Sequence, residues 1–227
     1  MNNLDLYAKA EHLLGIEEAT EALYDLYRSE LDDKNVTTLL DVGCGRGGFM
    51  QRLISDGVQC KGVDLSAVMI DECREQGLDA ECKDVTEVDG KYDAIVAIFD
   101  VLNFLDKDSL VKFLEAIAQK LNDDGIFIAD INTRYGFSDV AEGTMSSEND
   151  KEFLSVDAEF INDELHTKFT LFLKNEDENY TKYQDTIIQY FHAIKTFQKL
   201  SGLKLVEKQT FSLYDTEDKT LLIFKKR

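Results

Sequence analysis

The sequence predicts an α/β fold with a mostly parallel sheet, because short apolar segments alternate with segments of helical periodicity. The clearest unit is 36–54, where an apolar run is followed by a glycine-rich turn and then by a helical pattern. This order predicts a buried strand, a tight turn and a helix. Four later segments predict further strands, in chain order 58–64, 80–85, 92–100 and 125–130.

The turn after the first strand carries glycine at four of six positions, namely 43, 45, 47 and 48. Glycine lets the backbone turn sharply and approach a ligand where a Cβ atom would collide. The following helix directs its unpaired N–H groups toward whatever lies over the loop. Four glycines exceed what a turn needs, so the segment predicts a binding site for a nucleotide-type cofactor.

One pattern in this turn matches the dinucleotide fingerprint, because Gly43-x-Gly45-x-x-Gly48 is followed by Asp64, 21 residues after Gly43. An NAD(P)- or FAD-dependent oxidoreductase is therefore one reading of the loop. Asp41 argues against it, since a dinucleotide-binding strand is more often apolar two residues before the first glycine.

An acidic residue followed by Gly-x-Gly-x-Gly fits the loop better, because Asp41 precedes three alternating glycines at 43, 45 and 47. In this respect the chain resembles the class I S-adenosylmethionine-dependent methyltransferases. S-adenosylmethionine is a sulfonium with an amino-acid tail and no pyrophosphate, so an acid beside the loop is useful. The resemblance continues through 36–131 and resumes at the C-terminus, and it implies S-adenosyl-L-methionine as the cofactor.

The resemblance also implies roles for residues at the strand ends. Asp64 would accept hydrogen bonds from both ribose hydroxyls, Asp84 would reach the adenine amino group, and the N–H of Val85 would reach the adenine ring. Asp100 would hold the amino group of the cofactor, with base catalysis as the alternative role. The full expected cofactor site is Tyr7, Asp41, Gly43, Cys44, Gly45, Gly47, Asp64, Leu65, Asp84, Val85, Phe99 and Asp100. For Tyr7, packing against the core is the alternative role.

The fold implied by the resemblance is the Rossmann-like, seven-stranded methyltransferase fold. Ser66 is a plausible N-cap for a helix that ends near Gly77, and a further helix is expected over 108–121. The chain is expected to finish with a helix over 194–202 and two strands, the last of them antiparallel to the others. A dinucleotide dehydrogenase has no reason to finish in this way.

Four regions are expected along the chain. They are an N-terminal helical lid (1–35), the cofactor-binding core (36–144), an inserted antiparallel sheet over the active site (145–191), and a C-terminal helix with strands that completes the core (192–227). The insertion alternates polar and apolar residues in about three strands. It resembles that of a group of poorly characterised bacterial methyltransferases. We expect the face with His166, Lys168 and Thr170 to select the acceptor, and Phe169 and Leu171 on the other face to provide stability.

Methyl transfer from a sulfonium is an in-line displacement, so the protein mainly has to align the reacting atoms and exclude water. Asp130, Asn132 and Tyr135 follow the fifth strand and are the expected catalytic residues, with Asn103 nearby. His166 and His192 are each either a base or a packing residue. Arg134 is either a carboxylate partner or a surface residue, and no metal site is expected.

The formal charge of −20, from 45 acidic and 25 basic residues, bears on the partners. A nucleic-acid methyltransferase needs a basic surface, so nucleic acid is not expected as a partner. The absence of proline excludes the Asn/Asp-Pro-Pro-aromatic motif of methyltransferases that act on planar nitrogens. A small-molecule methyl acceptor is expected. A non-catalytic S-adenosylmethionine-binding protein is the remaining alternative.

The four cysteines have no C-x-x-C spacing, and no apolar run reaches 18 residues. The beginning of the chain lacks the basic and apolar regions of a signal peptide. We therefore expect a cytoplasmic bacterial enzyme that needs no membrane and is a monomer or a homodimer.

Overall fold

The computed structural model describes residues 3–32, 34–198, 200 and 202–227. Its main sheet has seven strands in the spatial order β10-β11-β5-β4-β1-β2-β3. The strands are β1 (Thr38–Val42), β2 (Gln59–Asp64), β3 (Ala80–Cys82), β4 (Tyr92–Ala97), β5 (Leu121–Asn132), β10 (Leu203–Phe211) and β11 (Lys219–Lys226). β11 is antiparallel to both of its neighbours, whereas β1 to β5 pair in parallel. The expected sheet, with its last strand antiparallel, is confirmed.

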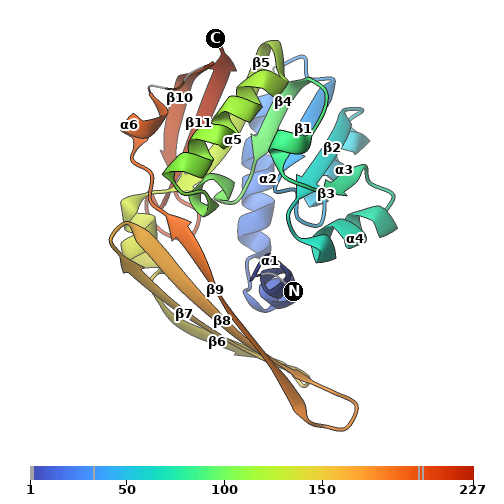
Figure 1. Cartoon of the computed structure of the whole chain (residues 1–227), viewed down its shortest axis with the longest axis vertical. Helices are drawn as coiled ribbons and strands as arrows, with labels where there is room; N and C mark the ends of the chain where they lie inside the picture. Colours follow the sequence, from blue (N-terminus) through green and yellow to red (C-terminus); the bar gives the residue numbers. More distant parts are fainter. Residues whose placement is uncertain (1–2, 33, 199, 201) are drawn as a thin grey trace.

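Helices cover both faces of this sheet (Figure 1). The helices are α1 (Asn3–Ala10), α2 (Glu17–Asp32), α3 (Gly48–Ser55), α4 (Ala67–Glu75), α5 (Lys107–Lys120) and α6 (Ile194–Phe197), with short turns η1 (Glu11–Leu13), η2 (Val85–Glu87), η3 (Val101–Phe104) and η4 (Gly136–Ala141). One apolar cluster joins α5 and α6 to the sheet, and a second joins α2 and α3 to the opposite face. Strands covered on both sides are apolar along most of their length, as in other parallel sheets.

Ser66 caps α4 as expected, because its hydroxyl accepts a hydrogen bond from the N–H of Met69 at 3.4 Å. The expected terminal helix over 194–202 is wrong in length. The structure has a helix only at Ile194–Phe197, while 199 and 201 lie outside the described residues. Gly202 has a φ of +79° and β10 begins at Leu203, so a helix that reached 202 would not fit before the strand. None of the described helices is both long and apolar enough to cross a bilayer.

A second, antiparallel sheet lies below the carboxyl ends of the parallel strands (Figure 1). It has four strands, β6 (Gly143–Glu148), β7 (Glu152–Ile161), β8 (Glu164–Lys174) and β9 (Tyr180–Tyr190), instead of the expected three. The sequence missed β6 because its residues are mostly small and polar. As an exposed edge strand, β6 has no apolar face to bury and is held by main-chain pairing to β7.

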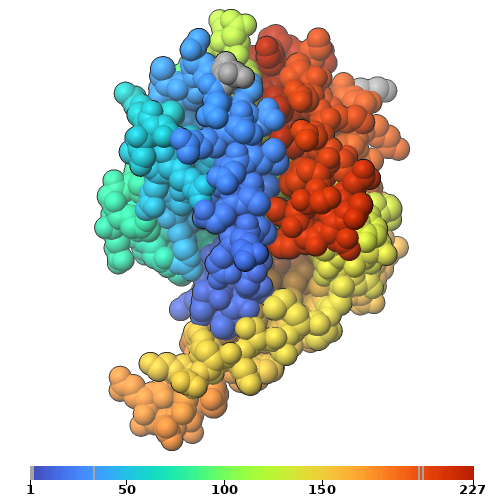
Figure 2. Space-filling model, turned by 180° about the vertical axis from the view of Figure 1, so that it is seen from behind, coloured from blue at the N-terminus to red at the C-terminus, as the bar shows by residue number. Residues whose placement is uncertain are grey.

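The face of this sheet that was expected to provide stability is the buried one, whereas the face expected to select the acceptor is turned away from the body of the protein. Phe169 and Leu171 are buried against α1 and η1, so their face is the one turned toward the body of the protein. His166 and Lys168 lie on the opposite face and are partly exposed, with Thr170 buried on that same face. The alternation of polar and apolar residues along the strand defines two faces, and the apolar face is the one that packs against the rest of the protein. Viewed from behind, the N-terminal segment runs down the body and meets the insertion (Figure 2).

This packing predicts unequal effects of two substitutions on one strand. Leu171→Ala removes a fully buried side chain from the cluster with α1 and is expected to lower the free energy of unfolding by about 2–5 kcal/mol. Lys168→Ala, on the exposed face, is expected to change it by less than about 0.5 kcal/mol. Urea denaturation followed by circular dichroism measures both, and equal losses of stability would contradict the packing.

Candidate cofactor site

The glycine turn after β1 adopts a conformation that other residues cannot easily adopt. Gly43, Gly45 and Gly47 have φ values of +75°, +54° and +77°. A Cβ atom on Gly43 would lie 2.7 Å from Val101, and one on Gly47 would lie 2.3 Å from Leu78. Gly43 and Gly45 line a cavity, whereas Gly47 shapes the backbone that starts α3.

Asp64 ties this turn to the end of β2. One carboxylate oxygen accepts the N–H of Gly45 at 3.0 Å, and the other accepts the N–H of Ser66 at 2.8 Å. Burial raises the pKa of Asp64, while these backbone hydrogen bonds oppose the rise. The carboxylate is therefore fixed in place, and it lines the cavity with lone pairs available to a further donor.

Asp41, at the inner end of the glycine turn, is 2 % exposed and also lines the cavity. Across the described residues, its Oδ1 is the buried side-chain polar atom that lacks a hydrogen-bond partner. Burial, together with the negative charge of Asp64, raises the pKa of Asp41 to about 8. A buried carboxyl group without a partner is costly, so this oxygen is suited to a donor supplied by a ligand.

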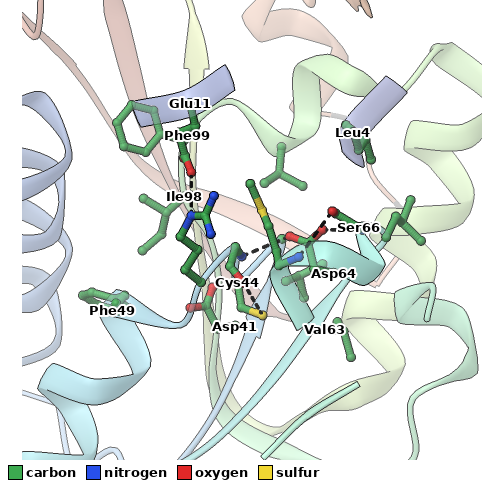
Figure 3. A pocket seen from close by; sticks show the side chains of 18 of the residues that line it. Leu4, Glu11, Asp41, Cys44, Phe49, Val63, Asp64, Ser66, Ile98 and Phe99 are labelled. Carbon is green, nitrogen blue, oxygen red and sulfur yellow. Dashed lines mark hydrogen bonds and ion pairs between the residues drawn. The ribbon is translucent and has the colours of Figure 1, made fainter. Parts of the chain in front are cut away.

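The cavity has a volume of about 650 Å³ and lies between the strand ends and the N-terminal segment. Leu4 and Glu11 lie across it from Asp41, Cys44 and Asp64 (Figure 3). This volume is in the range of small-molecule and cofactor sites.

The N-terminal segment is fastened over the cavity at two points. Arg46, in the glycine turn, donates to the carbonyl of Ala8 at 2.6 Å and to Glu11 at 3.1 Å. Near the other end of α1, the hydroxyl of Ser66 donates to Asp5 at 2.9 Å. These contacts connect α1 and η1 to the residues that follow β1 and β2 beside the cavity.

Tyr7 lines the cavity from α1, and its ring packs edge-on against Phe169 of the insertion at 5.9 Å. Burial raises the pKa of Tyr7 above its usual range, so the hydroxyl stays protonated. Cys44 lines the cavity as a small buried side chain, and a hydrogen bond with Cys73, together with burial, raises the pKa of its thiol. Neither group is arranged as a nucleophile.

Leu65, Asp84 and Val85 line the part of the cavity next to β2 and β3. Asp84 also begins η2, where its carboxylate accepts the N–H of Thr86 at 2.8 Å. Leu65 is 49 % exposed and offers an apolar surface there. A ligand ring in this part of the cavity would meet apolar side chains and one carboxylate.

The turn after β4 places two residues in sequence in the left-handed region, Phe99 at φ +66° and Asp100 at +61°. Phe99 lines the cavity, but Asp100 does not. Both carboxylate oxygens of Asp100 are engaged, one by Lys219 and the other by the Asn132 amide at 2.8 Å. Burial and nearby Asp130 raise the pKa of Asp100 to about 6, against the opposing effect of Lys219.

The three residues expected to be catalytic lie away from the cavity wall. Asp130 is fully buried, and Asn132 is 7 % exposed and bonded to Asp100. Tyr135 is 41 % exposed, and its hydroxyl donates to Asp215 at 3.1 Å. The structure thus brings together ten of the twelve expected cofactor residues on one cavity and places Gly47, Asp100 and the three expected catalytic residues outside it.

The other residues singled out in the sequence have local partners. His166 contacts Glu164, and Arg134 contacts Asp163. Buried His192 lies within hydrogen-bond distance of the carbonyls of Leu102 and Leu105. Among the described residues, no group of three or more His, Cys, Asp or Glu side chains is arranged to hold a metal ion.

Several residues near the site were not predicted from the sequence. Arg46 has no signal beyond its place in the glycine turn. The helical spacing of Tyr27 indicates only a packing residue, yet its hydroxyl also donates to Asp130 at 2.7 Å. Lys219 begins an apolar strand, where a lysine would ordinarily reach solvent, but it is 1 % exposed. Nothing in the sequence around Tyr27 or Lys219 indicates a buried partner more than 80 positions away.

Known proteins match this chain in both sequence and fold. Residues 39–125 match the methyltransferase domain family. A protein of Geobacillus sp. (strain WCH70), whose name assigns it provisionally to the methyltransferases, is 24 % identical over 198 residues, which cover 79 % of this chain and 80 % of that protein.

Two solved structures share the whole fold. An S-adenosylmethionine-dependent methyltransferase from Clostridium acetobutylicum ATCC 824 superposes with a TM-score of 0.80 at 22 % identity, covering 97 % of this chain and 98 % of that one. CalS10 from Micromonospora echinaspora, an amino pentose methyltransferase solved with S-adenosylmethionine bound, has a TM-score of 0.74 at 15 % identity, covering 98 % and 97 %.

The glycine turn, the sheet order and these matches agree with one another and exclude the dinucleotide-dependent alternative. Residues 39–125 match a methyltransferase domain, and this match, together with the shared fold, indicates an S-adenosylmethionine-dependent methyltransferase with S-adenosylmethionine as its cofactor.

Proposed function

We propose that this protein transfers a methyl group to a small-molecule acceptor that carries an amino group, with the cofactor held in the cavity described above. The observation that carries the cofactor placement is the buried, unpartnered oxygen of Asp41 beside the glycine turn. An ammonium group is the natural partner of such an oxygen, and the amino-acid tail of S-adenosylmethionine has one.

The remaining cofactor contacts follow from the residues that line the cavity. Asp64 would accept hydrogen bonds from the ribose hydroxyls, while Asp84 and the backbone of Val85 would meet the adenine with Leu65 beside it. Gly43 and Gly45 line the cavity without a side chain, so a ligand could approach their backbone closely. Tyr7, Cys44 and Phe99 would complete the walls.

When bound, S-adenosylmethionine supplies a methyl group that is already activated by a sulfonium. The residues of this chain then have to orient the two reactants and exclude water. Leu4 and Tyr7 cover the cavity from α1, and α1 is itself packed against the insertion. We assign Asp100, Asn132 and Asp130 to holding the turn after β4, because they do not line the cavity and bond to one another or to that turn.

Two observations support a small acceptor with an amino group. The chain carries a formal charge of −20, and the cavity is lined by more acidic than basic side chains, including Glu17, Glu21 and Asp84. A negative electrostatic potential favours the binding of cations and disfavours the binding of phosphate-rich polymers. CalS10, which shares the fold, acts on an amino pentose.

The proposed function predicts where a labelled methyl group goes. The protein is incubated with methyl-labelled S-adenosylmethionine and a bacterial extract, which is then divided into macromolecules and ultrafiltrate. We expect label in the ultrafiltrate, retained on a cation exchanger. Label confined to nucleic acid or protein would contradict the proposal, and intact cofactor binding with no label anywhere would favour a non-catalytic binding protein.

The role of Asp64 predicts a loss of cofactor affinity. Asp64→Ala removes the acceptor of two hydroxyl hydrogen bonds and is expected to weaken binding of S-adenosylhomocysteine by about 1.5–3 kcal/mol. Calorimetry measures the change, with exposed Asp79, which does not line the cavity, replaced by alanine as the matched control. Unchanged affinity in a folded Asp64→Ala variant would show that the ribose lies elsewhere.

A further inference from the structure

We propose that Asp130, Lys219 and Tyr27 are positioning residues that hold the turn after β4 in the shape needed to bind the cofactor. The inference rests on the proposed placement of the cofactor, because Ile98, Phe99 and Val101 of this segment line that cavity. None of the three positioning residues lines it. Their effect on the site must therefore pass through the turn.

The turn has a backbone conformation that needs support from its surroundings. Phe99 and Asp100 both have positive φ values, and neither is a glycine. An L-residue in this region is disfavoured because its Cβ atom crowds the backbone, and two in succession are rarer still. Such strained segments persist where the surrounding structure fixes them, and they are often found at functional sites.

Asp130 supplies the main restraint. Its two carboxylate oxygens accept the N–H of Phe99 at 2.9 Å and the N–H of Asp100 at 3.2 Å. The two N–H groups that bind this one carboxylate belong to the two residues with positive φ. The end of β5 thus clamps the end of β4 through a single buried side chain.

Tyr27 and Lys219 fix the clamp from two further elements. The Tyr27 hydroxyl, on α2, lies 2.7 Å from Asp130 Oδ1 and 3.0 Å from the carbonyl of Ala97. The Lys219 ammonium, at the start of β11, contacts Asp100 and lies 3.7 Å from Asp130 Oδ2. Lys219 supplies the positive charge beside two buried acids, which keeps both side chains in place.

Lys219 also lies over the Phe99 ring, whose centroid is 5.8 Å from its ammonium nitrogen. Burial lowers the pKa of Lys219, but the charges of Asp100 and Asp130 outweigh burial and raise it. The lysine therefore remains charged under conditions in which the protein is folded. Four elements (α2, β4, β5 and β11) thus converge on one turn of the cavity wall.

The test compares variants of two positioning residues, Asp130 and Tyr27, with a control in which another hydrogen-bonded aspartate is replaced. Asp130→Asn replaces one acceptor oxygen with an amide, and Tyr27→Phe removes only a hydroxyl. Asp93 is the matched control, because its carboxylate also accepts several hydrogen bonds, from Thr37, Thr38 and Asn122, at the amino end of β4. Asp93→Asn should reduce stability without reaching the cavity.

We expect Asp130→Asn to raise the dissociation constant of S-adenosylhomocysteine by about 10- to 100-fold and Tyr27→Phe by about fivefold, because each loses a hydrogen bond that holds the turn. Asp93→Asn should leave it within about twofold. Hydrogen exchange at the amides of Phe99 and Asp100 should accelerate in Asp130→Asn and remain slow in Asp93→Asn.

Unchanged affinity in the folded clamp variants would overturn the inference, as would equal losses in Asp93→Asn. If Asp130→Asn does not fold, the affinity of Tyr27→Phe for S-adenosylhomocysteine tests the inference. Wild-type protein that fails to bind S-adenosylhomocysteine would instead refute the proposed placement of the cofactor, so the two failures are distinguishable.

Discussion

Four acidic side chains lie at or just beyond the carboxyl ends of neighbouring parallel strands, and each must be compensated because it is largely buried. Asp64 is compensated by backbone N–H groups of the glycine turn and of the residues that follow β2. Asp100 and Asp130 share Lys219 and several hydrogen bonds. Asp41 has an oxygen with no partner. Burying a charge without a partner is far costlier than burying a paired one.

This difference has a consequence for the protein without its cofactor. The pKa of Asp41 is raised from 3.8 to about 8, so the carboxyl is protonated in the folded protein at neutral pH but ionised in the unfolded chain. Its contribution to stability is therefore fully present below about pH 4 and is lost as the pH rises through about 8. An ammonium group beside Asp41 would lower the pKa of this carboxyl again, because it favours the charged carboxylate.

Much of the fold could be predicted from the sequence because its signals are local. The glycine turn, the N-cap at Ser66 and the apolar strands each depend on residues a few positions apart. The order of motifs then indicates the sheet topology. For the same reason the sequence located most of the cavity wall, since parallel strands end at the same edge of a sheet.

What the sequence did not predict depends on contacts between distant segments. Tyr27 and Asp130 are 103 positions apart, and no periodicity connects them. Asp130 occupies the expected place for a catalytic residue, at the end of β5, but its carboxylate points into the protein to hold the turn after β4. In the insertion, alternation distinguished the Phe169 face from the His166 face, but only packing against α1 determined which one faces the body.

The central claim is that the cofactor supplies the partner that Asp41 lacks, and proton release on binding tests it most directly. Calorimetric titration with S-adenosylhomocysteine at pH 7, in two buffers of different ionisation enthalpy, counts the protons released. A group with a pKa of about 8 that becomes ionised on binding should release roughly 0.9 of a proton, and Asp41→Asn should release none. Binding without proton release in the wild-type protein, or equal release from Asp41→Asn, would contradict the account.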